Sequence, residues 1–286
     1  MNKIYSAFCV LLVCFALFMS ACEKEDYTGQ STLKATDAKA TLEWTAPASL
    51  VEDNLVFPFT LTLDKPQVAD IHIYISSSGT ADDHDYSVTE EIIIPAFRTS
   101  ASGEFKVFGD ADIEENETVT VQIGDDRTTN VNFATQTKTV EIQNRVYPNL
   151  DLTFDWSGTV VYDGTSVSLC DSTDIDVLVF DADNNDLGIY GAATGSCPEH
   201  LTLETQPDGD YFMWANLYAS TIVPTDGSVV SMPITTTATQ PGKFENVVYS
   251  QSAASIITSA DPIDGSTLKP VVKVTKSGST YTITPL

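Results

Sequence analysis

The stretch GEFKVFGDADIEENETVTVQI, residues 103–123, carries a clear β-strand pattern on either side of an acidic turn. Apolar and polar residues alternate at its start and again over Glu117 to Ile123, which is the period of a half-buried β-strand. The turn between them is crowded with carboxylates: Asp110, Asp112, Glu114, Glu115 and Glu117. The stretch therefore predicts two strands joined by an acidic turn. That turn is either a metal site or a solvated surface turn.

The same alternating pattern recurs on both sides of residues 103–123 along most of the chain, and helical periodicity is nearly absent. Short runs rich in Val, Ile, Thr, Phe and Tyr are separated by Gly, Asp, Asn and Pro, as in 57–63, 70–76, 138–144, 173–186 and 207–220. This density of strands predicts an all-β protein of two antiparallel β-sandwich domains in tandem.

Pro148 interrupts the ladder pattern and marks the expected boundary between a domain at 40–146 and another at 147–286. The Thr/Ser/Pro-rich segment from Ser220 to Ser259 predicts long loops with one or two edge strands. The last residues predict a hairpin closed at Ser277-Gly278.

The chain begins with a short positive start at Lys3 and an apolar run from Ile4 to Met19 that is too short for an ordinary membrane span. Small residues and Cys22 follow. The pattern resembles a bacterial lipoprotein signal peptide (1–21) cleaved before Cys22, and the resemblance implies a lipidated cysteine that anchors the protein to a membrane. The alternative is a plain secretory signal cut nearby.

The residues after the cysteine, CEKED, resemble the signal that sends some Gram-negative lipoproteins to the outer cell surface. This resemblance implies an outer-membrane, lipid-anchored protein exposed at the cell surface; the periplasmic face is the alternative. The polar, aperiodic residues 22–39 predict a flexible tether.

The 286 residues carry a formal net charge of −26, which excludes nucleic acid as a natural partner because the two would repel each other. Cations, basic proteins and neutral glycans remain as partners. An acidic surface that simply keeps an exported protein soluble is the alternative interpretation.

Five cysteines occur in the sequence. Cys9 and Cys14 leave with the signal peptide, and Cys22 is lipidated. Cys170 and Cys197 remain as a pair in an oxidising compartment, so a disulfide is the economical prediction.

Residues 40–145 resemble a Calx-β domain. The resemblance is carried by LVEDN (50–54), SSGTADDHDYS (77–87) and the long block at 92–123 that contains the acidic turn. In calcium-binding members of that family, loops at one end of the sandwich converge their carboxylates.

The resemblance implies Glu52, Asp85, Asp110 and Glu114 as calcium ligands, since calcium takes six to eight oxygens, largely from Asp and Glu. Gly109 stands where the family pattern begins its Asp run, and the domain ends in Asn144-Arg145 in place of further aspartates. Arg145 could instead place its guanidinium among the carboxylates and take the place of the metal.

Residues 150–220 are similar to jelly-roll modules of the pre-peptidase C-terminal kind, which act as binding or stabilising appendages. In this region Asp174, Asp176, Asp181 and Asp183 either cradle a cation or form a solvated strand edge and turn.

The aromatic strand YFMWANLY (211–218) is apolar on both faces, which predicts a central strand buried on one side and partly covered on the other. If the face of Trp214 and Tyr218 were open, it would be a platform on which a sugar could stack.

No frame of catalytic residues is recognisable around the three histidines, so we do not expect an enzyme. The sequence predicts a non-catalytic surface module for adhesion or interaction with a protein or glycan as its ligand, whose acidic end either binds calcium as a cofactor or is solvated or paired with Arg145. The alternative is a glycan-binding accessory of a surface polysaccharide-uptake system.

Overall fold

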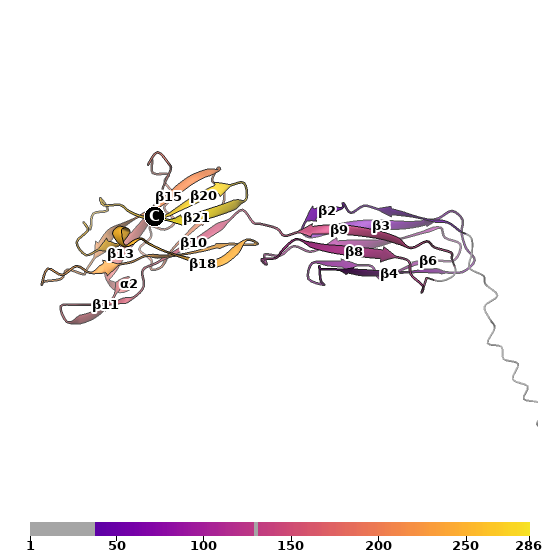
Figure 1. Cartoon of the computed structure of the whole chain (residues 1–286), viewed down its shortest axis with the longest axis horizontal. Helices are drawn as coiled ribbons and strands as arrows, with labels where there is room; N and C mark the ends of the chain where they lie inside the picture. The colour runs from indigo at the N-terminus through magenta and orange to yellow at the C-terminus, as the bar shows by residue number, and fades with distance from the viewer. Residues whose placement is uncertain (1–37, 129–130) are drawn as a thin grey trace, which may run out of the picture.

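The structure is a computed structural model and describes residues 38–128 and 131–286. The predicted signal peptide, Cys22 and nearly all of the predicted tether lie outside the described residues. Within them, no helix is long and apolar enough to cross a membrane. The chain is all-β, as its alternating pattern predicts, and Figure 1 shows two groups of strands placed end to end. We name them the N-terminal sandwich (β1 to β9) and the C-terminal sandwich (β10 to β21).

The N-terminal sandwich has two sheets. One has the order β1-β3-β7-β5, with bounds Ala40–Trp44, Leu55–Leu63, Ser100–Val107 and Tyr86–Val88. The other has the order β2-β9-β8-β4-β6, with bounds Ser49–Val51, Gln136–Gln143, Glu117–Ile123, Ile71–Gly79 and Glu91–Ile94. The pair β2–β9 is parallel, and the other pairs of these two sheets are antiparallel.

The alternation that predicts β8 also explains its packing. Val119, Val121 and Ile123 are fully buried, while the residues between them face away from the core. A period of two places every second side chain on the same face, so one strand contributes one apolar row to the core.

The C-terminal sandwich also rests on two main sheets. One has the order β14-β10-β17-β18, with bounds Glu199–Leu203, Leu150–Asp155, Thr235–Gln240 and Phe244–Ser250. The other has the order β13-β15-β20-β21, with bounds Thr173–Phe180, Gly209–Ser220, Lys269–Ser277 and Thr280–Pro285. The smaller elements are β11 (Thr159–Tyr162), β12 (Thr165–Ser168), α2 (Leu169–Ser172), β16 (Ser231–Met232), the 3₁₀ turn η1 (Ala253–Ser255) and β19 (Ile257–Thr258).

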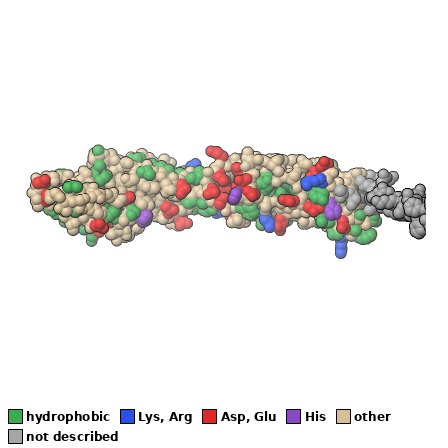
Figure 2. Space-filling view, turned by 90° about the horizontal axis from the view of Figure 1, so that it is seen from below, with side chains coloured by type: hydrophobic (Ala, Val, Ile, Leu, Met, Phe, Trp, Pro, Cys, Tyr) green, Lys and Arg blue, Asp and Glu red, His purple; other side chains and the backbone are tan. Residues whose placement is uncertain are grey.

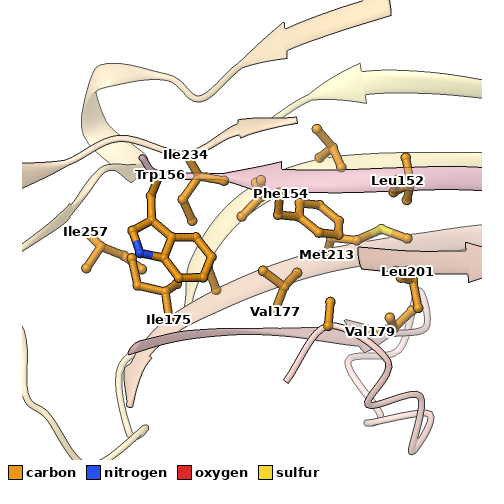
Figure 3. Close-up of a cluster of buried hydrophobic side chains, with 14 of the residues drawn as sticks. Leu152, Phe154, Trp156, Ile175, Val177, Val179, Leu201, Met213, Ile234 and Ile257 are labelled. Atoms are coloured by element: carbon orange, nitrogen blue, oxygen red, sulfur yellow. The ribbon is translucent and has the colours of Figure 1, made fainter. Parts of the chain in front are cut away.

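A separate hydrophobic core fills the C-terminal sandwich. Figure 3 shows Phe154 and Trp156 pointing toward Ile175 and Val177, so side chains from both main sheets meet. All four are at most 1% exposed. The buried cluster of the N-terminal sandwich contains none of these residues, so each sandwich has its own core.

The Thr-rich segment after Ser220 meets the expectation of long loops with edge strands in part, since residues 221–230 form a loop and β18 is an edge strand. It also contains β17, an interior strand that pairs with β10 on one side and β18 on the other. Thr236, Ala238 and Gln240 of β17 are buried. Threonine is β-branched and fits an interior strand. Because it carries a hydroxyl group, it is not counted as apolar when buried strands are predicted from the pattern of apolar residues.

The final hairpin is shifted by one residue from the expected turn. Ser277 pairs with Thr280, so the two loop residues are Gly278 and Ser279. Gly278 has a φ of +58°, which a two-residue hairpin turn requires and which glycine adopts without steric cost.

The predicted disulfide is confirmed. Cys170 in α2 is bonded to Cys197 in the loop before β14. The bond ties the segment that leads into β13 to the segment that leads into β14, which belong to different main sheets.

Candidate metal centre

Three segments that are distant in sequence meet at the end of the N-terminal sandwich that faces the C-terminal sandwich. Glu52 follows β2, and its N–H donates to the carbonyl of Gln143 on β9 at 2.9 Å. Asp85 precedes β5, and its carbonyl accepts from the Phe108 N–H at 2.8 Å. Glu114 belongs to the acidic turn (109–116) between β7 and β8. Backbone hydrogen bonds thus hold two of the three segments in place.

Glu52, Asp85 and Glu114 form the candidate site. One oxygen of each lies within 4.8 Å of the others. Glu52 is 3% exposed and Asp85 is 4% exposed, whereas Glu114 is open to solvent. The site therefore has a buried floor and an accessible rim.

Asp110, the fourth predicted ligand, lies near this group without belonging to it. Its Oδ1 accepts from the N–H of Asp112 at 2.8 Å, which closes a local turn. Its charge still acts on the site, because it contributes to raising the pKa of Glu52 and of Glu114.

Negative charge dominates the electrostatics of the site. Burial raises the pKa of Glu52, and an N–H hydrogen bond from Arg145 opposes that rise. Burial also raises the pKa of Glu114, and the charges of Asp85 and Asp110 add to the effect. Loss of water and like charges both favour the neutral acid, and for Glu52 the hydrogen bond and the charge of Arg145 oppose them.

Glu117, at the start of β8, is a further carboxylate of this acidic group and was not among the ligands predicted from the sequence. Burial and a hydrogen bond shared with Asp85 raise its pKa to about 7. The clue in the sequence was its place directly after the acidic turn, which keeps it at the same end of the sandwich.

Arg145 contributes to the site through its backbone. Its N–H donates to Oε1 of Glu52 at 2.9 Å. Its guanidinium pairs with Oδ1 of Asp53 at 2.9 Å and stacks on Tyr147, with Cζ 4.8 Å from the ring centre. Within the described residues the ion pair of this guanidinium is with Asp53 and not with a candidate ligand, but its charge still acts on Glu52 and lowers the pKa of that carboxyl.

The acidic turn also touches the C-terminal sandwich. The Gly242 N–H donates to the carbonyl of Ala111 at 3.1 Å. Gly242 has a φ of +72°, and a Cβ there would lie 1.9 Å from the carbonyl oxygen of Arg145, so only glycine fits this junction. A cavity of about 630 Å³ lies here, lined by the acidic turn and by the β17–β18 turn. Figure 2 shows Asp and Glu side chains gathered near the middle of the long axis.

Asn144 lies at the same junction. Its Nδ2 donates to the carbonyl of Glu114 at 2.8 Å. Its Oδ1 is buried and has no hydrogen-bond partner within the described part of the chain. A neutral oxygen of this kind suits a hard cation.

The predicted aromatic pair lies on β15, away from this site. Trp214 is half-buried and Tyr218 is 59% exposed. Tyr211, Met213 and Leu217, on the other face of the strand, are buried in the core. The strand is thus buried on one face and partly covered on the other.

Glu117→Gln is expected to stabilise the protein at alkaline pH. The folded pKa of Glu117, about 7, lies above its ordinary value, so ionisation opposes folding. The penalty is absent below about pH 4.5, grows as the pH rises, and is complete above about pH 7. The melting temperature of the variant should exceed that of the parent at pH 8 and match it at pH 4. An equal difference at both pH values would contradict the assignment.

Comparison with known proteins yields only distant similarity. No model of a protein family matches the chain, and no curated protein matches it. Among solved structures it is similar to CBD12 from CALX1.2, with 9% identity, a TM-score of 0.32, and coverage of 69% of this chain and 79% of that one. It is also similar to the apo-form Calx CBD1 domain, with 14% identity, a TM-score of 0.29, and coverage of 38% and 97%.

The E. coli chaperone DraB is a third similar structure, with 8% identity, a TM-score of 0.24, and coverage of 65% of this chain and 95% of that one. Values this low do not assign a family or an activity. The fold and the site define its structural class: the protein is an all-β chain of two sandwiches, with a cluster of carboxylates where the two sandwiches meet.

Proposed function

We propose that the protein is a non-catalytic, calcium-binding interaction module of the cell surface. The observation that carries the proposal is the convergence of Glu52, Asp85 and Glu114 within 4.8 Å. Calcium prefers such oxygen ligands and tolerates irregular geometry. The residue blocks that resemble a Calx-β domain place acidic loops at this same end of the sandwich.

The electrostatics favour a bound cation. The pKa values of Glu52, Glu114 and Glu117 are all raised, each with burial as the largest cause. A divalent cation would relieve both the mutual repulsion of these groups and the cost of removing them from water.

Calcium would act on the junction between the sandwiches. Glu114 belongs to the turn whose Ala111 carbonyl accepts from the Gly242 N–H. A cation that holds Glu114 against Glu52 and Asp85 also orders that turn. The expected result is a stiffer pair of sandwiches that presents its binding surfaces away from the membrane.

The membrane anchor is part of the proposal and rests on the sequence around Cys22. The protein would be held at the outer membrane and exposed at the cell surface. Mass spectrometry of the mature N-terminus tests this directly, because acylation of Cys22 adds the mass of its lipid. An unmodified or absent Cys22 would refute the anchor.

Calorimetric titration of residues 38–286, which hold both hydrophobic cores, tests calcium binding. We expect a dissociation constant of about 10⁻⁴ to 10⁻³ M, as in extracellular modules. Glu114→Gln should weaken binding at this site at least tenfold, because it removes a charged ligand. Glu115→Gln changes the neighbouring exposed acid and is the matched control. Equal heats in both variants would sink the proposed site.

Glycan binding is the second candidate function, favoured by the exposure of Tyr218 beside half-buried Trp214 on one face of β15. Aromatic rings present flat apolar surfaces on which sugar rings stack. We expect specific binding on a glycan array that is lost in Trp214→Ala and retained in Tyr190→Ala, which removes an exposed tyrosine from the loop between β13 and β14. Failure of the parent protein to bind any glycan would exclude this function.

A further inference from the structure

Strand β13 carries two aspartates on its outer face. Ile175, Val177 and Val179 are fully buried and point into the core (Figure 3). Alternation therefore places Asp174 and Asp176 on the opposite face of the strand. Both remain half-buried there.

Asn216 of β15 shares this outer face. It is paired in register with Asp176, and residues opposite each other in an antiparallel pair project to the same side. Asn216 is 4% exposed. An amide is thus buried on a face where its neighbours include two carboxylates.

Two oxygens of this group lack donors. Oδ1 of Asn216 and Oδ1 of Asp174 are both buried and have no hydrogen-bond partner within the described part of the chain. Neither Asp174 nor Asp176 forms an ion pair among the described residues. Leaving such acceptors buried and unpaired costs free energy, about 1 to 3 kcal/mol each and more when they are charged.

A third carboxylate makes the charge imbalance worse. Glu199 is 1% exposed, and its own oxygens accept from the N–H and hydroxyl groups of Thr194 and from the N–H of Ser196. The negative charges of Asp174 and Glu199 both act on Asp176. The positive charge that would balance this group is absent from the described residues around it.

Two loops close over the group through glycines. A Cβ at Gly195 would lie 3.6 Å from Oδ2 of Asp174, and a Cβ at Gly265 would lie 3.6 Å from Oδ1 of Asn216. An opening of about 310 Å³ adjoins Asp174. That volume holds several water molecules, at about 30 Å³ each, so a hydrated ion can reach Asp174, whereas Asp176 and Asn216 do not line the opening.

The other two aspartates of this region behave differently. Oδ1 of Asp181 accepts from the N–H groups of Asp183 and Asn185, at 2.9 and 2.8 Å, and closes its own turn. Asp183 is exposed. The turn at Asp181, whose carboxylate is hydrogen-bonded, is therefore separate from the outer face of β13, where buried oxygens lack hydrogen-bond donors.

We propose that Asp174, Asp176 and Asn216 form a second cation site, specific for a hard divalent ion such as calcium, on the outer face of the C-terminal sandwich. Two carboxylates and an amide oxygen are the donor set that such ions prefer. Three protein ligands leave positions for water, so we expect a dissociation constant of about 10⁻⁴ to 10⁻³ M. The site is independent of the one at Glu114, which lies on the other sandwich.

The test uses residues 38–286 carrying Glu114→Gln, which weakens the first site at least tenfold, at calcium concentrations near the expected dissociation constant of the second site, so that the first site stays mostly empty. We expect calcium to raise the melting temperature in a saturable way. The double substitution Asp174→Asn with Asp176→Asn should raise the melting temperature without calcium, because it removes buried charge, and should abolish the calcium-dependent shift. Asp181→Asn is the matched control and should keep that shift.

Terbium luminescence provides a second measurement on the same variants. Trp214 lies on the face of β15 that carries Asn216, so excitation of its indole should sensitise a bound terbium ion. We expect Trp214→Phe to reduce the signal severalfold. A calcium shift that persists in the double variant, or no shift in the parent, would overturn the second site. If the site at Glu114 does not bind calcium, both measurements still test the second site, because the tested chain lacks Glu114.

Discussion

Trp156→Ala is expected to lower the free energy of unfolding by about 3 to 5 kcal/mol, because it leaves a large cavity in a packed core. Trp156 is 1% exposed and is the largest fully buried side chain of the described residues. Its ring packs among Ile175, Ile234 and Ile257 (Figure 3), which come from three separate strands or connections. Such a site cannot collapse by moving one side chain, so most of the cavity remains.

Urea denaturation followed by far-ultraviolet circular dichroism measures this effect without relying on tryptophan fluorescence. Tyr218→Ala is the control, since it removes an aromatic ring of the same sandwich that is 59% exposed, and its effect should stay within about 0.5 kcal/mol. Each sandwich has its own core, so the transition that changes should be that of the C-terminal sandwich. Similar losses in the two variants would show that Trp156 does not anchor this core.

Replacing both Cys170 and Cys197 with serine is expected to lower the free energy of unfolding by about 3 to 4 kcal/mol. The two cysteines are 27 residues apart, and the chain-entropy estimate for a loop of this length gives that value. The cross-link reduces the conformational freedom of the unfolded chain between α2 and β14. Its removal therefore acts mainly on the unfolded state.

Reduction of the parent protein with dithiothreitol should reproduce the loss, and the same reagent should leave the double serine variant unchanged. Residues 38–286 contain Cys170 and Cys197 as their cysteines, so no other thiol confuses the comparison. A parent protein whose stability is unaffected by complete reduction would contradict the expected stabilisation.

Much of the fold follows from local pattern. The strand expected over Glu117 to Ile123 has those bounds in the structure, because strict alternation next to an acidic turn leaves few other options. The sequence does not predict β17 as an interior strand. This strand is rich in threonine and pairs with a neighbouring strand on each of its edges. Propensity alone does not reveal which strand lies in the interior of a sheet.

The site was less predictable than the fold. Glu52, Asp85 and Glu114 converge, whereas Asp110 closes a local turn and Glu117 joins the group through Asp85. A resemblance to a family places a loop at one end of a sandwich, but the direction of each side chain depends on contacts within the folded chain.

The sequence by itself determined the strand content, the pairing of Cys170 with Cys197 and the position of the acidic turn, because each depends on local periodicity, composition or a count of residues. Only the tertiary structure decided which carboxylates share a centre and that the Arg145 guanidinium pairs with Asp53. It also decided that Asp176 lies opposite Asn216, with Asp174 on the same face of β13. These contacts join residues that are distant in sequence. A hydrogen bond or a close contact between charged groups forms only when the atoms lie within a few ångströms of each other, and the tertiary structure sets those distances.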